Sequence, residues 1–430
     1  MPSATPFCAI DFGTSNSAIA LPQGSKGVRL VELEAGQRTM PTAVFYAVEG
    51  LAAHQEPHRH HGRAAVAAYV EGIEGQLMRS MKSILGSPLA QQATDVGAGR
   101  SVRYLDIVVH FLRHLKSLAE RDAGQPLRRV VLGRPVFFVD DDPERDAAAQ
   151  AALLEAAHAV GFQDVRFQFE PIAAALDYET TVNEEQLVLV ADIGGGTSDF
   201  SLVRVGPERA QRIDRLDDIL ANHGVHVAGT DFDRQIELGH ILPLAGYKGM
   251  GPTGREVPSK VYFDFATWHL INTVYTPTRI AELRRMKSFY ADLQQHAHLM
   301  TVLEERLGHG LIAQAEAAKI AVAEGGRTDI DLDLLVAGLS VPLQEQQASA
   351  AVASQIDQIA EAASQTLRQA GVSADSVRAL YFTSGSTGLR PLTDAIAARF
   401  PAAKAIRGDR FASVAQGLGQ HARRVFGGLG

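Results

Sequence analysis

The sequence predicts an α/β protein built from two related lobes. Its 430 residues exceed what one hydrophobic core usually supports, so two or more domains are expected. Strand-like apolar runs alternate with helical segments, as in α/β folds with largely covered sheets. One pattern occurs twice, as CAIDFGTSNSAIAL at 8–21 and LVADIGGGTSDFSLVRV at 189–205. Each copy places an Asp and a Gly-rich turn with Thr-Ser between two strand-like runs. A duplication at this separation indicates two lobes and not a solenoid.

Composition narrows the class of protein. Hydrophobic residues make up 46% and charged residues 21% of the chain, and the net charge is -8, which argues against nucleic acid or an anionic membrane as a partner. The single cysteine, Cys8, excludes an intrachain disulfide and is expected to be a buried strand residue. Without a basic and apolar leader or an apolar run of about 18 residues, the sequence predicts a cytoplasmic protein.

The regular elements outside the two repeats follow in order. We expect a strand at 128–138, an alanine-rich helix at 144–162 that ends at Gly161, and a strand that stops at Pro171 before the next helix. Near the end, a strand at 378–389 runs into a Gly/Ser loop. A helix, a strand and a final helix are expected to follow over 390–426.

Two segments interrupt this alternation, and each follows one of the repeated turns. Residues 36–104 are predicted to be polar and irregular, with a helical region near their end. Residues 223–327 are predicted to be richer in helix, and 278–307 is their longest periodic stretch. Six apolar positions should form its core face, although a groove for a protein partner stays open as an alternative. They are Ile280, Leu283, Met286, Leu293, Leu299 and Leu303.

The repeated turns favour phosphate binding. Neither copy has the GxxxxGK[ST] pattern of a Walker A loop. A dinucleotide fingerprint also fails, because Asp199 occupies the place of its third glycine and a strand follows where a helix is required. Two glycine-bearing hairpins remain, each with carboxylates at its turn. Facing each other, they could grip a phosphate chain from both sides while aspartates hold a hydrated Mg²⁺.

Six motifs together resemble the ATPase domain of the seventy-kilodalton heat-shock (DnaK-type) chaperones, most closely the short YegD-like subgroup. They are IDFGTSNS (10–17), FEPIAAALDYE (169–179), VADIGGGTSDF (190–200), HVAGTDFD (226–233), EAAKIAV (316–322) and TSGSTGLRP (383–391). The resemblance implies an actin-like ATPase fold, in which each lobe has a ribonuclease-H-like core and an inserted subdomain. Lobe I would be 1–181 with 36–104 inserted. Lobe II would be 182–430 with 223–327 inserted, and its last helix, 410–426, would pack back on lobe I.

The resemblance also implies roles around ATP and Mg²⁺. Asp11 and Asp199 would hold the metal through water molecules, and Lys82 would reach the γ-phosphate. Glu170 and Asp192 would order the attacking water, with Thr197 in the same catalytic group. The remaining nucleotide contacts would come from Gly13, Thr14, Ser15, Asn16, Gly194, Gly195, Gly196, Gly229, Glu316, Lys319, Ser384, Gly385, Ser386 and Asp409.

The expected function is that of a chaperone-like, weak ATPase in which nucleotide state changes lobe closure. Ile320 and Gly388 stand where the family usually has two adenine-clamping arginines, which predicts weaker ATP binding. The chain stops at Gly430, so no peptide-clamp domain is expected. A protein partner would use the helical insertion of lobe II. A small-molecule kinase of the same superfamily and an actin-like filament protein remain alternatives.

Two residue assignments also have plainer alternatives. Lys82 could be a solvated surface lysine, because single charges are usually exposed. The histidine-rich run at 54–62 is expected to be a solvated loop and not a metal site, since it lacks a helical i, i+4 ligand pair.

Overall fold

Two large sheets with the same topology organise the molecule. The computed structural model describes residues 6–24, 27–51, 55–97, 99–139, 142–408 and 413–427. The first sheet has the order β3-β2-β1-β10-β11, with β4 added to β2, and the second has the order β14-β13-β12-β17-β18. In both, the central strand has an antiparallel hairpin partner on one side and a parallel strand on the other. The predicted duplication of the core is confirmed.

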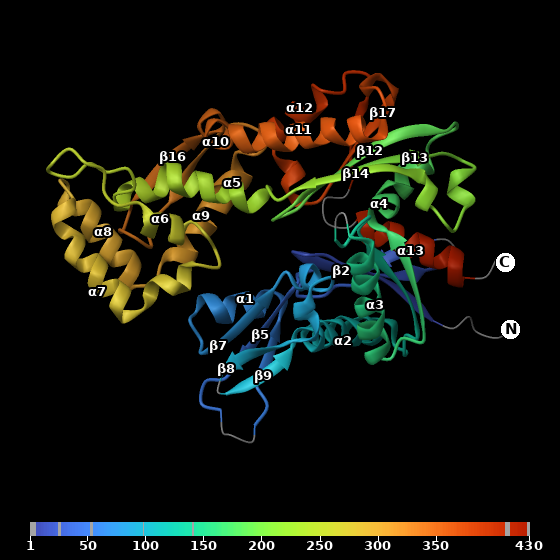
Figure 1. Ribbon diagram of the computed structural model, residues 1–430, viewed down its shortest axis with the longest axis horizontal. Coiled ribbons are helices and arrows are strands. Elements are labelled where there is room, and N and C mark those ends of the chain that lie inside the picture. Colours follow the sequence, from blue (N-terminus) through green and yellow to red (C-terminus); the bar gives the residue numbers. More distant parts are fainter. Residues whose placement is uncertain are drawn as a thin grey trace.

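We call the first sheet with its covering elements lobe I and the second lobe II (Figure 1). The strands of the first sheet are β1 (Phe7–Phe12), β2 (Asn16–Gln23), β3 (Gly27–Leu30), β4 (Thr39–Pro41), β10 (Arg129–Arg134) and β11 (Asp164–Phe169). Those of the second are β12 (Gln186–Ile193), β13 (Ser198–Val205), β14 (Ile219–Val225), β17 (Val377–Thr383) and β18 (Lys404–Arg407).

Helices cover both sheets. They are α2 (Tyr104–Ala123), α3 (Pro143–Ala159), α4 (Glu170–Glu179), α11 (Ala353–Ala370), α12 (Arg390–Ala397) and α13 (Ser413–Phe426). Of these helices, α3, α4, α12 and α13 were predicted, whereas α2 and α11 were not. The alanine-rich α3 begins at a strong cap, because the Asp142 side chain accepts a hydrogen bond from the Arg145 amide and a proline follows it. Gly161, just beyond its end, has φ +93, a backbone angle that favours glycine.

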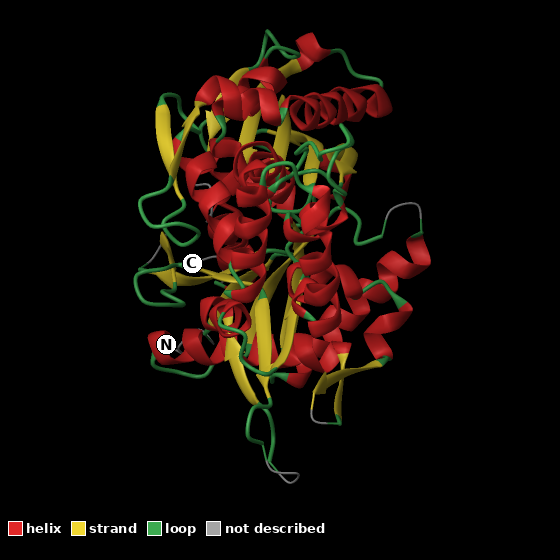
Figure 2. Cartoon of the chain, turned by 90° about the vertical axis from the view of Figure 1, so that its left-hand side faces the viewer, coloured by secondary structure: helices red, strands yellow, loops and turns green. Residues whose placement is uncertain are grey.

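Helices α4 and α13 pack against each other between the two sheets, and Figure 2 shows helices lying between the upper and lower groups of strands. The apolar cluster around them draws on both sheets, with Val131 from lobe I, Val190 from lobe II and Leu418 from α13. The approach is close, because a Cβ atom on Gly417 would lie 1.9 Å from the Ala173 carbonyl oxygen. Glycine is therefore required where the two helices cross.

The insertion of lobe I is more regular than predicted. It contains a three-stranded sheet with the order β6-β5-β7, one helix and a hairpin. The elements are β5 (Ala43–Ala47), β6 (His58–His61), α1 (Gly62–Val70), β7 (Gly75–Arg79), β8 (Ala93–Gly97) and β9 (Arg100–Arg103). The expected helical region near its end is limited to two short 3-10 helices, Met81–Ile84 and Pro88–Gln91, and a hairpin follows them. Apart from the buried, apolar β5, its strands are short, mostly half-buried or exposed, and rich in polar residues, so they give no apolar run in the sequence.

The histidine-rich run, expected to be a solvated loop, forms a strand from His58 to His61. His58–His61 form β6, which pairs with β5, and the His61 ring stacks on His114 with ring centroids 4.0 Å apart. No group of three or more His, Cys, Asp or Glu side chains in the described part of the chain is arranged to hold a metal ion directly.

The insertion of lobe II is mainly helical, as predicted, but it continues beyond the predicted boundary at 327 through a two-stranded sheet and a further helix. Its elements are α5 (Gly229–Ile236), α6 (Lys260–Phe265), α7 (Pro277–Arg285), α8 (Leu293–Glu304), α9 (Gly308–Ala321), β15 (Arg327–Asp331), β16 (Ser340–Gln344) and α10 (Glu345–Ala351). The periodic stretch at 278–307 is two helices and not one. A 3-10 turn, Met286–Phe289, ends the first, and the Asp292 side chain caps the second by accepting from the Gln294 amide.

That break explains one wrong core assignment. Leu293 begins α8 and is 53% exposed, whereas Leu283, Leu299 and Leu303 are buried as expected.

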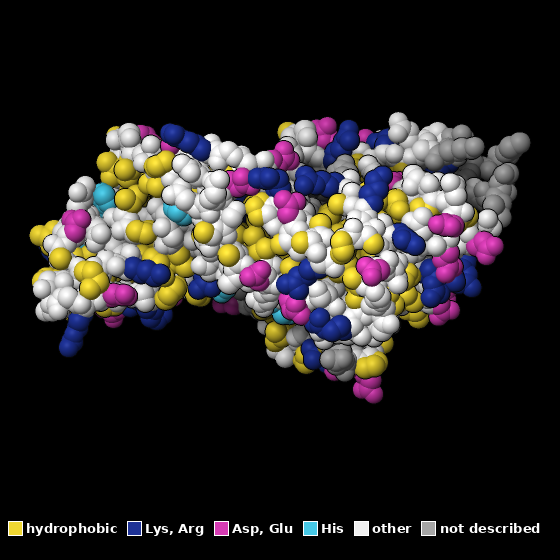
Figure 3. Space-filling view, turned by 90° about the horizontal axis from the view of Figure 1, so that it is seen from above, with side chains coloured by type: hydrophobic (Ala, Val, Ile, Leu, Met, Phe, Trp, Pro, Cys, Tyr) yellow, Lys and Arg dark blue, Asp and Glu magenta, His cyan; other side chains and the backbone are white. Residues whose placement is uncertain are grey.

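Figure 3, which views the molecule from above, shows acidic and basic side chains interspersed on that face. Among the described residues, we find no helix whose length and hydropathy would let it span a membrane.

Candidate functional site

The two repeated turns meet where the sheets face each other. The first joins β1 to β2, and a Cβ atom on Gly13 would lie 2.2 Å from the Asn16 carbonyl oxygen, so only glycine fits there. The second joins β12 to β13 and is closed by a 3.0 Å hydrogen bond from the Gly194 amide to the Thr197 carbonyl. A Cβ atom on Gly195 would lie 3.1 Å from Ser15 Oγ. The turns are therefore in contact across the boundary between the lobes.

Two distant segments hold the three-glycine turn. The amide of Gly229 donates to the Gly194 carbonyl over 3.2 Å, and the Thr230 amide donates to the Gly195 carbonyl over 2.8 Å. The Ser386 hydroxyl also donates to the Gly194 carbonyl, at 2.7 Å. The structure thus brings together three motifs that lie up to 192 residues apart in the chain.

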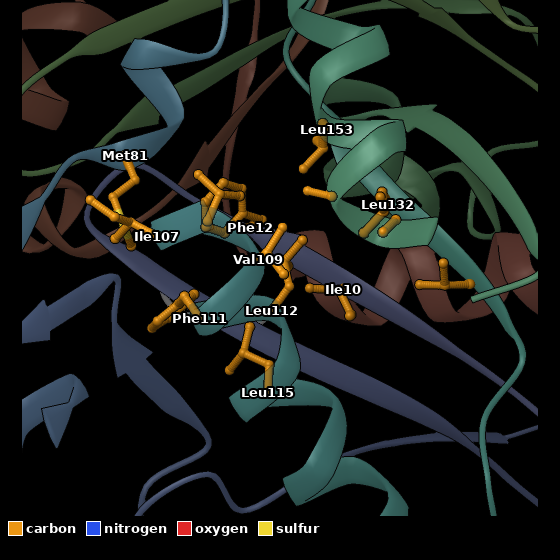
Figure 4. Close-up of a cluster of buried hydrophobic side chains, with 14 of the residues drawn as sticks. Ile10, Phe12, Met81, Ile107, Val109, Phe111, Leu112, Leu115, Leu132 and Leu153 are labelled. Carbon is orange, nitrogen blue, oxygen red and sulfur yellow. The ribbon is translucent and has the colours of Figure 1, made fainter. Parts of the chain in front are cut away.

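Lys82 lies beside this boundary and is not a surface lysine. Its side chain is 8% exposed, and its Nζ lies 2.5 Å from Oε1 of Glu170. Glu170 is the first residue of α4, with Pro171 second, so the helix begins two residues earlier than predicted. The neighbour of Lys82, Met81, packs beside Ile107 in the core of lobe I (Figure 4). This apolar anchor fixes the 3-10 turn Met81–Ile84 that carries the lysine.

Carboxylates outnumber cations at the boundary. Burial and the charge of Glu170, opposed by Lys82 and reinforced by Asp192, together raise the pKa of Asp11 to about 8. A carboxyl group that is short of positive charge is held partly protonated, and an added cation would favour its ionised form. The first turn therefore has a carboxylate suited to a divalent ion.

The second turn presents a comparable group. Asp192 pairs in register with Asp199 on β13 and with Thr383 on β17. Burial raises the pKa of Asp192 to about 6, and Asp199 adds to this effect, while a hydrogen bond from Ser384 lowers it. Ser384 has φ 68, a left-handed conformation that is unusual for a serine.

These groups fit Mg²⁺ held through water better than a directly chelated metal. The donors are carboxylate oxygens from both lobes, which suit a hard cation that keeps part of its hydration shell. They do not converge as a direct three-ligand cluster within the described residues. Asp11 and Asp199 are the residues that would hold such an ion.

The predicted ribose contacts lie on α9, on the lobe II side. Lys319 Nζ is 2.6 Å from Asp233 Oδ1 and donates to the Gly229 carbonyl at 3.3 Å. Burial raises the pKa of Asp233 to about 6, and Lys319 lowers it. Asp233 belongs to the quoted motif HVAGTDFD, but sequence analysis gave it no role. Glu316 is exposed on the same helix.

The predicted adenine side lacks arginines at the two expected positions. Ile320 is 63% exposed near the end of α9, and Gly388 is buried in a 3-10 turn. Arg390 lies close to this helix end, since its amide donates to the Ala323 carbonyl at 2.8 Å. Its guanidinium forms an ion pair with Glu345, a partner that sequence analysis missed because no local pattern links the two.

The other predicted contacts sit at the turns. Thr14 and Ser15 are half-buried, whereas Asn16, Gly196 and Gly385 are exposed. Asp409 lies outside the described residues. Apart from it, the predicted residues fall on the two turns and their flanking strands, the Lys82 turn, the start of α4, the start of α5, α9 and the segment Ser384–Ser386.

Comparison with known proteins gives the relationship. A family model described as "Hsp70 protein" matches residues 7–242, more than half of the chain. Over 229 residues, the chain is 30% identical to "Chaperone protein DnaK" of Thermosipho melanesiensis and of Thermosipho africanus. The match covers 53% of this chain and 34% of each relative, so the chain spans about a third of their length. The residues matched by the family model include both turns and Lys82, whereas Glu316 and Ser386 lie beyond them.

The fold agrees with that match. Two sheets of one topology, each with an inserted subdomain and with helices between them, form the actin-like ATPase architecture expected from the motifs. The chain therefore belongs to the Hsp70 family, as an ATPase domain of that family.

Proposed function

We propose that the chain binds ATP with Mg²⁺ between its two lobes and hydrolyses it as a chaperone-like ATPase. The observation that carries this proposal is the buried Lys82–Glu170 pair beside two phosphate-loop-like turns in contact. A buried ion pair costs desolvation energy and is weak evidence for stability alone. Its place at the boundary between the lobes is better explained if the two charged groups interact with a charged ligand.

Each group has a physical role in this proposal. Backbone amides and hydroxyls of the turns at 13–16 and 194–197 would donate to phosphate oxygens from opposite sides. Asp11 and Asp199 would hold the hydrated metal, which when bound neutralises phosphate charge. Lys319 and Glu316 would contact the ribose, and Ser384–Ser386 would border the nucleoside.

Hydrolysis would then depend mainly on positioning and charge. Phosphoryl transfer needs an oriented water and stabilisation of charge on the transferring group. Glu170 and Asp192 can accept hydrogen bonds from that water, while Lys82 places positive charge beside the γ-phosphate. Thr197, in the second turn, adds a hydroxyl.

The output would be a change in how the lobes close. Both lobes contribute to the phosphate site, so a ligand with different contacts in open and closed states shifts the balance between them. The helical insertion of lobe II is the surface we propose for a protein partner. The relatives named above are called chaperones, and we extend that role to this chain as part of the proposal.

Titration calorimetry with ATP, ADP and GTP, each with and without Mg²⁺, tests the binding step, and phosphate release tests the reaction. We expect Mg²⁺-dependent binding of ATP and slow release of phosphate. A chain that binds none of these nucleotides in the presence of Mg²⁺ would contradict the proposal.

Replacing Asp199 with asparagine should remove most of the Mg²⁺ dependence of ATP binding. The change keeps the shape of the side chain and takes away one of the two carboxylates assigned to the metal. We expect the gain in affinity from Mg²⁺ to shrink by about tenfold or more, which corresponds to 1.4 kcal/mol. Asp217→Asn, an exposed acid in the same lobe, is the matched control and should behave as wild type. An unchanged Mg²⁺ dependence in Asp199→Asn would show that the metal is held elsewhere.

Introducing an arginine at the exposed Ile320 should tighten ATP binding. A guanidinium stacked on a base contributes about 0.5–2 kcal/mol, so affinity should rise by roughly 2- to 30-fold. Ile320→Gln removes the apolar side chain without adding charge and serves as the control. If the wild type already binds tightly and Ile320→Arg adds nothing, another group holds the base, and Arg390→Ala would then weaken binding.

A further inference from the structure

Away from the phosphate turns, the two insertions touch through an aromatic cluster. Trp268 of lobe II stacks on Tyr69 of lobe I, with ring centroids 5.0 Å apart and an interplanar angle of 27°. The guanidinium carbon of Arg79, also from lobe I, lies 4.3 Å from the Trp268 ring centroid. His309 closes the cluster at 5.0 Å from Trp268 and 5.1 Å from Tyr69. We call these four side chains the interlobe clasp.

The clasp is suited to forming and opening repeatedly. It combines ring stacking with one cation–π contact, and none of its four side chains is a carboxylate that could form an ion pair with Arg79. Burial, with the charge of Arg79, lowers the pKa of His309 to about 4, so its ring packs as a neutral group at pH 7. Its Nε2 lies 3.2 Å from Asn272 Oδ1 in the same lobe, which fixes the ring on the lobe II side.

One end of the clasp leads directly to Lys82. Arg79 is the last residue of β7, and Ser80 follows in a left-handed conformation with φ 53. The 3-10 turn with Lys82 begins at the next residue, and the Ser83 hydroxyl donates to the Ser80 carbonyl at 2.7 Å. This φ is unfavourable for a residue other than glycine, so contacts of the residues on both sides of Ser80 must stabilise its conformation.

The turn therefore has two anchors of different kinds. Met81 lies in the core of lobe I and holds the turn whatever the lobes do. Arg79 is held by Trp268, which belongs to the other lobe, so this anchor exists only while the insertions touch. Glu316, the predicted ribose contact, also acts electrostatically on Arg79 and links the clasp to the nucleotide side.

We propose that Arg79 is a positioning residue for Lys82, engaged by Trp268 when the lobes close. This inference rests on the proposed function. Closure would complete the ordering of the Lys82 turn, so that the lysine reaches the γ-phosphate at the moment the site is shut. Arg79 itself touches no reacting group. Its loss should slow hydrolysis more than it weakens ATP binding.

Single-turnover hydrolysis and ATP affinity, measured on the full chain, test the inference. Arg79→Ala should lower the hydrolysis rate by about tenfold or more and change the ATP dissociation constant by less than about threefold. Arg79→Lys should restore part of the rate, because a cation over the indole remains. Trp268→Leu should slow hydrolysis to the same extent. The double variant should be no slower than either single variant, because each substitution removes the same contact between Arg79 and Trp268. Arg63→Ala, in the same insertion but paired with Glu34, is the control and should match wild type.

Fluorescence supplies a readout independent of activity. The chain has one tryptophan, so its emission reports on the clasp alone. ATP with Mg²⁺ should reduce quenching of Trp268 by acrylamide in the wild type and much less in Arg79→Ala. In the unliganded protein, Arg79→Ala should already quench more than wild type.

These experiments distinguish a failure of the proposed function from a failure of the positioning role of Arg79. A wild type that binds no ATP overturns the proposed function. A wild type that binds and hydrolyses ATP, beside an Arg79→Ala variant of equal rate, overturns only the positioning role. Additive losses in the double variant would show that Arg79 and Trp268 act separately, which also overturns it.

Discussion

Replacing Lys82 with alanine should lower the rate of ATP hydrolysis by about 10²–10³-fold, the usual loss on removing one group that stabilises charge in the transition state. ATP affinity should change by less than about threefold, because this charge acts mainly on the transferring phosphoryl group. The structure supports a strong effect, since Lys82 is buried and is held by Glu170. Single-turnover phosphate release and calorimetry measure the two quantities separately.

Removing a buried lysine also removes an ion pair, so the control must do the same elsewhere. Lys116 pairs with Glu120 at 2.6 Å within α2, and its side chain is 14% exposed. Lys116→Ala should leave hydrolysis unchanged. Equal losses of rate and affinity in Lys82→Ala would make Lys82 an ordinary binding residue, and no loss would remove it from the site.

Replacing Arg215 with alanine should destabilise the folded chain by about 3–5 kcal/mol, the cost of breaking a buried ion pair by removing one partner. Arg215 is 1% exposed and donates to both oxygens of Glu179, at 2.8 and 3.0 Å. It also pairs with Asp218, which is fully buried. Without the arginine, both carboxylates lose a buried charge partner. Denaturant unfolding, followed by circular dichroism, measures the change.

Arg212→Ala is the matched control in the same loop. Arg212 is 51% exposed and lies 4.0 Å from Asp218, so its removal should cost less than about 1 kcal/mol. If both variants unfold at the same denaturant concentration, the buried network contributes no net stability.

The same network bears on the site through α4. Glu179 is the last residue of this helix and Glu170 is the first, so nine residue steps, about 13.5 Å of helix, separate them. Arg215 holds one end of the helix to lobe II while Lys82 holds the other to the lobe I insertion. The hydrolysis rate of Arg215→Ala, measured at a temperature where this variant remains folded, therefore separates an effect of the network on hydrolysis from its effect on stability.

Much of the core was predictable because its signals are local. The hairpins at 8–21 and 189–205 carry their strands, turns and aspartates in one short stretch each. The helix at 143–159 is marked by Asp142, Pro143 and Gly161, which act through caps and backbone angles. Their agreement along the chain gave the α/β core and its duplication.

The insertions were harder because their stability comes from contacts between distant residues. Helices α7 and α8 share one periodic pattern, and the 3-10 turn Met286–Phe289 and the cap at Asp292 separate them. In β6, three histidines and an arginine have little strand propensity, and pairing with β5 decides the conformation. Leu293 fits the pattern and yet lies exposed.

The candidate site shows the same division. Asp11, Glu170 and Asp199 were predicted from their motifs and Lys82 from the family resemblance, and the structure places them along one boundary. The partners Asp233 and Glu345 were not predicted as such, because an ion pair between distant residues leaves no pattern in a single sequence. The stacking of Tyr69 on Trp268 was missed for the same reason.

Helix α13 has a consequence for how the protein is made. The helix completes the apolar cluster next to β1, although some 400 residues separate the two. At about 5–20 residues per second, a ribosome needs roughly 20–80 s to travel between them. Phe7 has no α13 to cover it for that time, and Val131 and Ala173, which are made later, lack it for the shorter time that remains. A nascent chain of this kind exposes apolar surface while it is synthesised and is prone to aggregate. We expect the nascent chain to depend on a factor that shields this apolar surface at the ribosome. The factor should release the chain only once α13 has emerged.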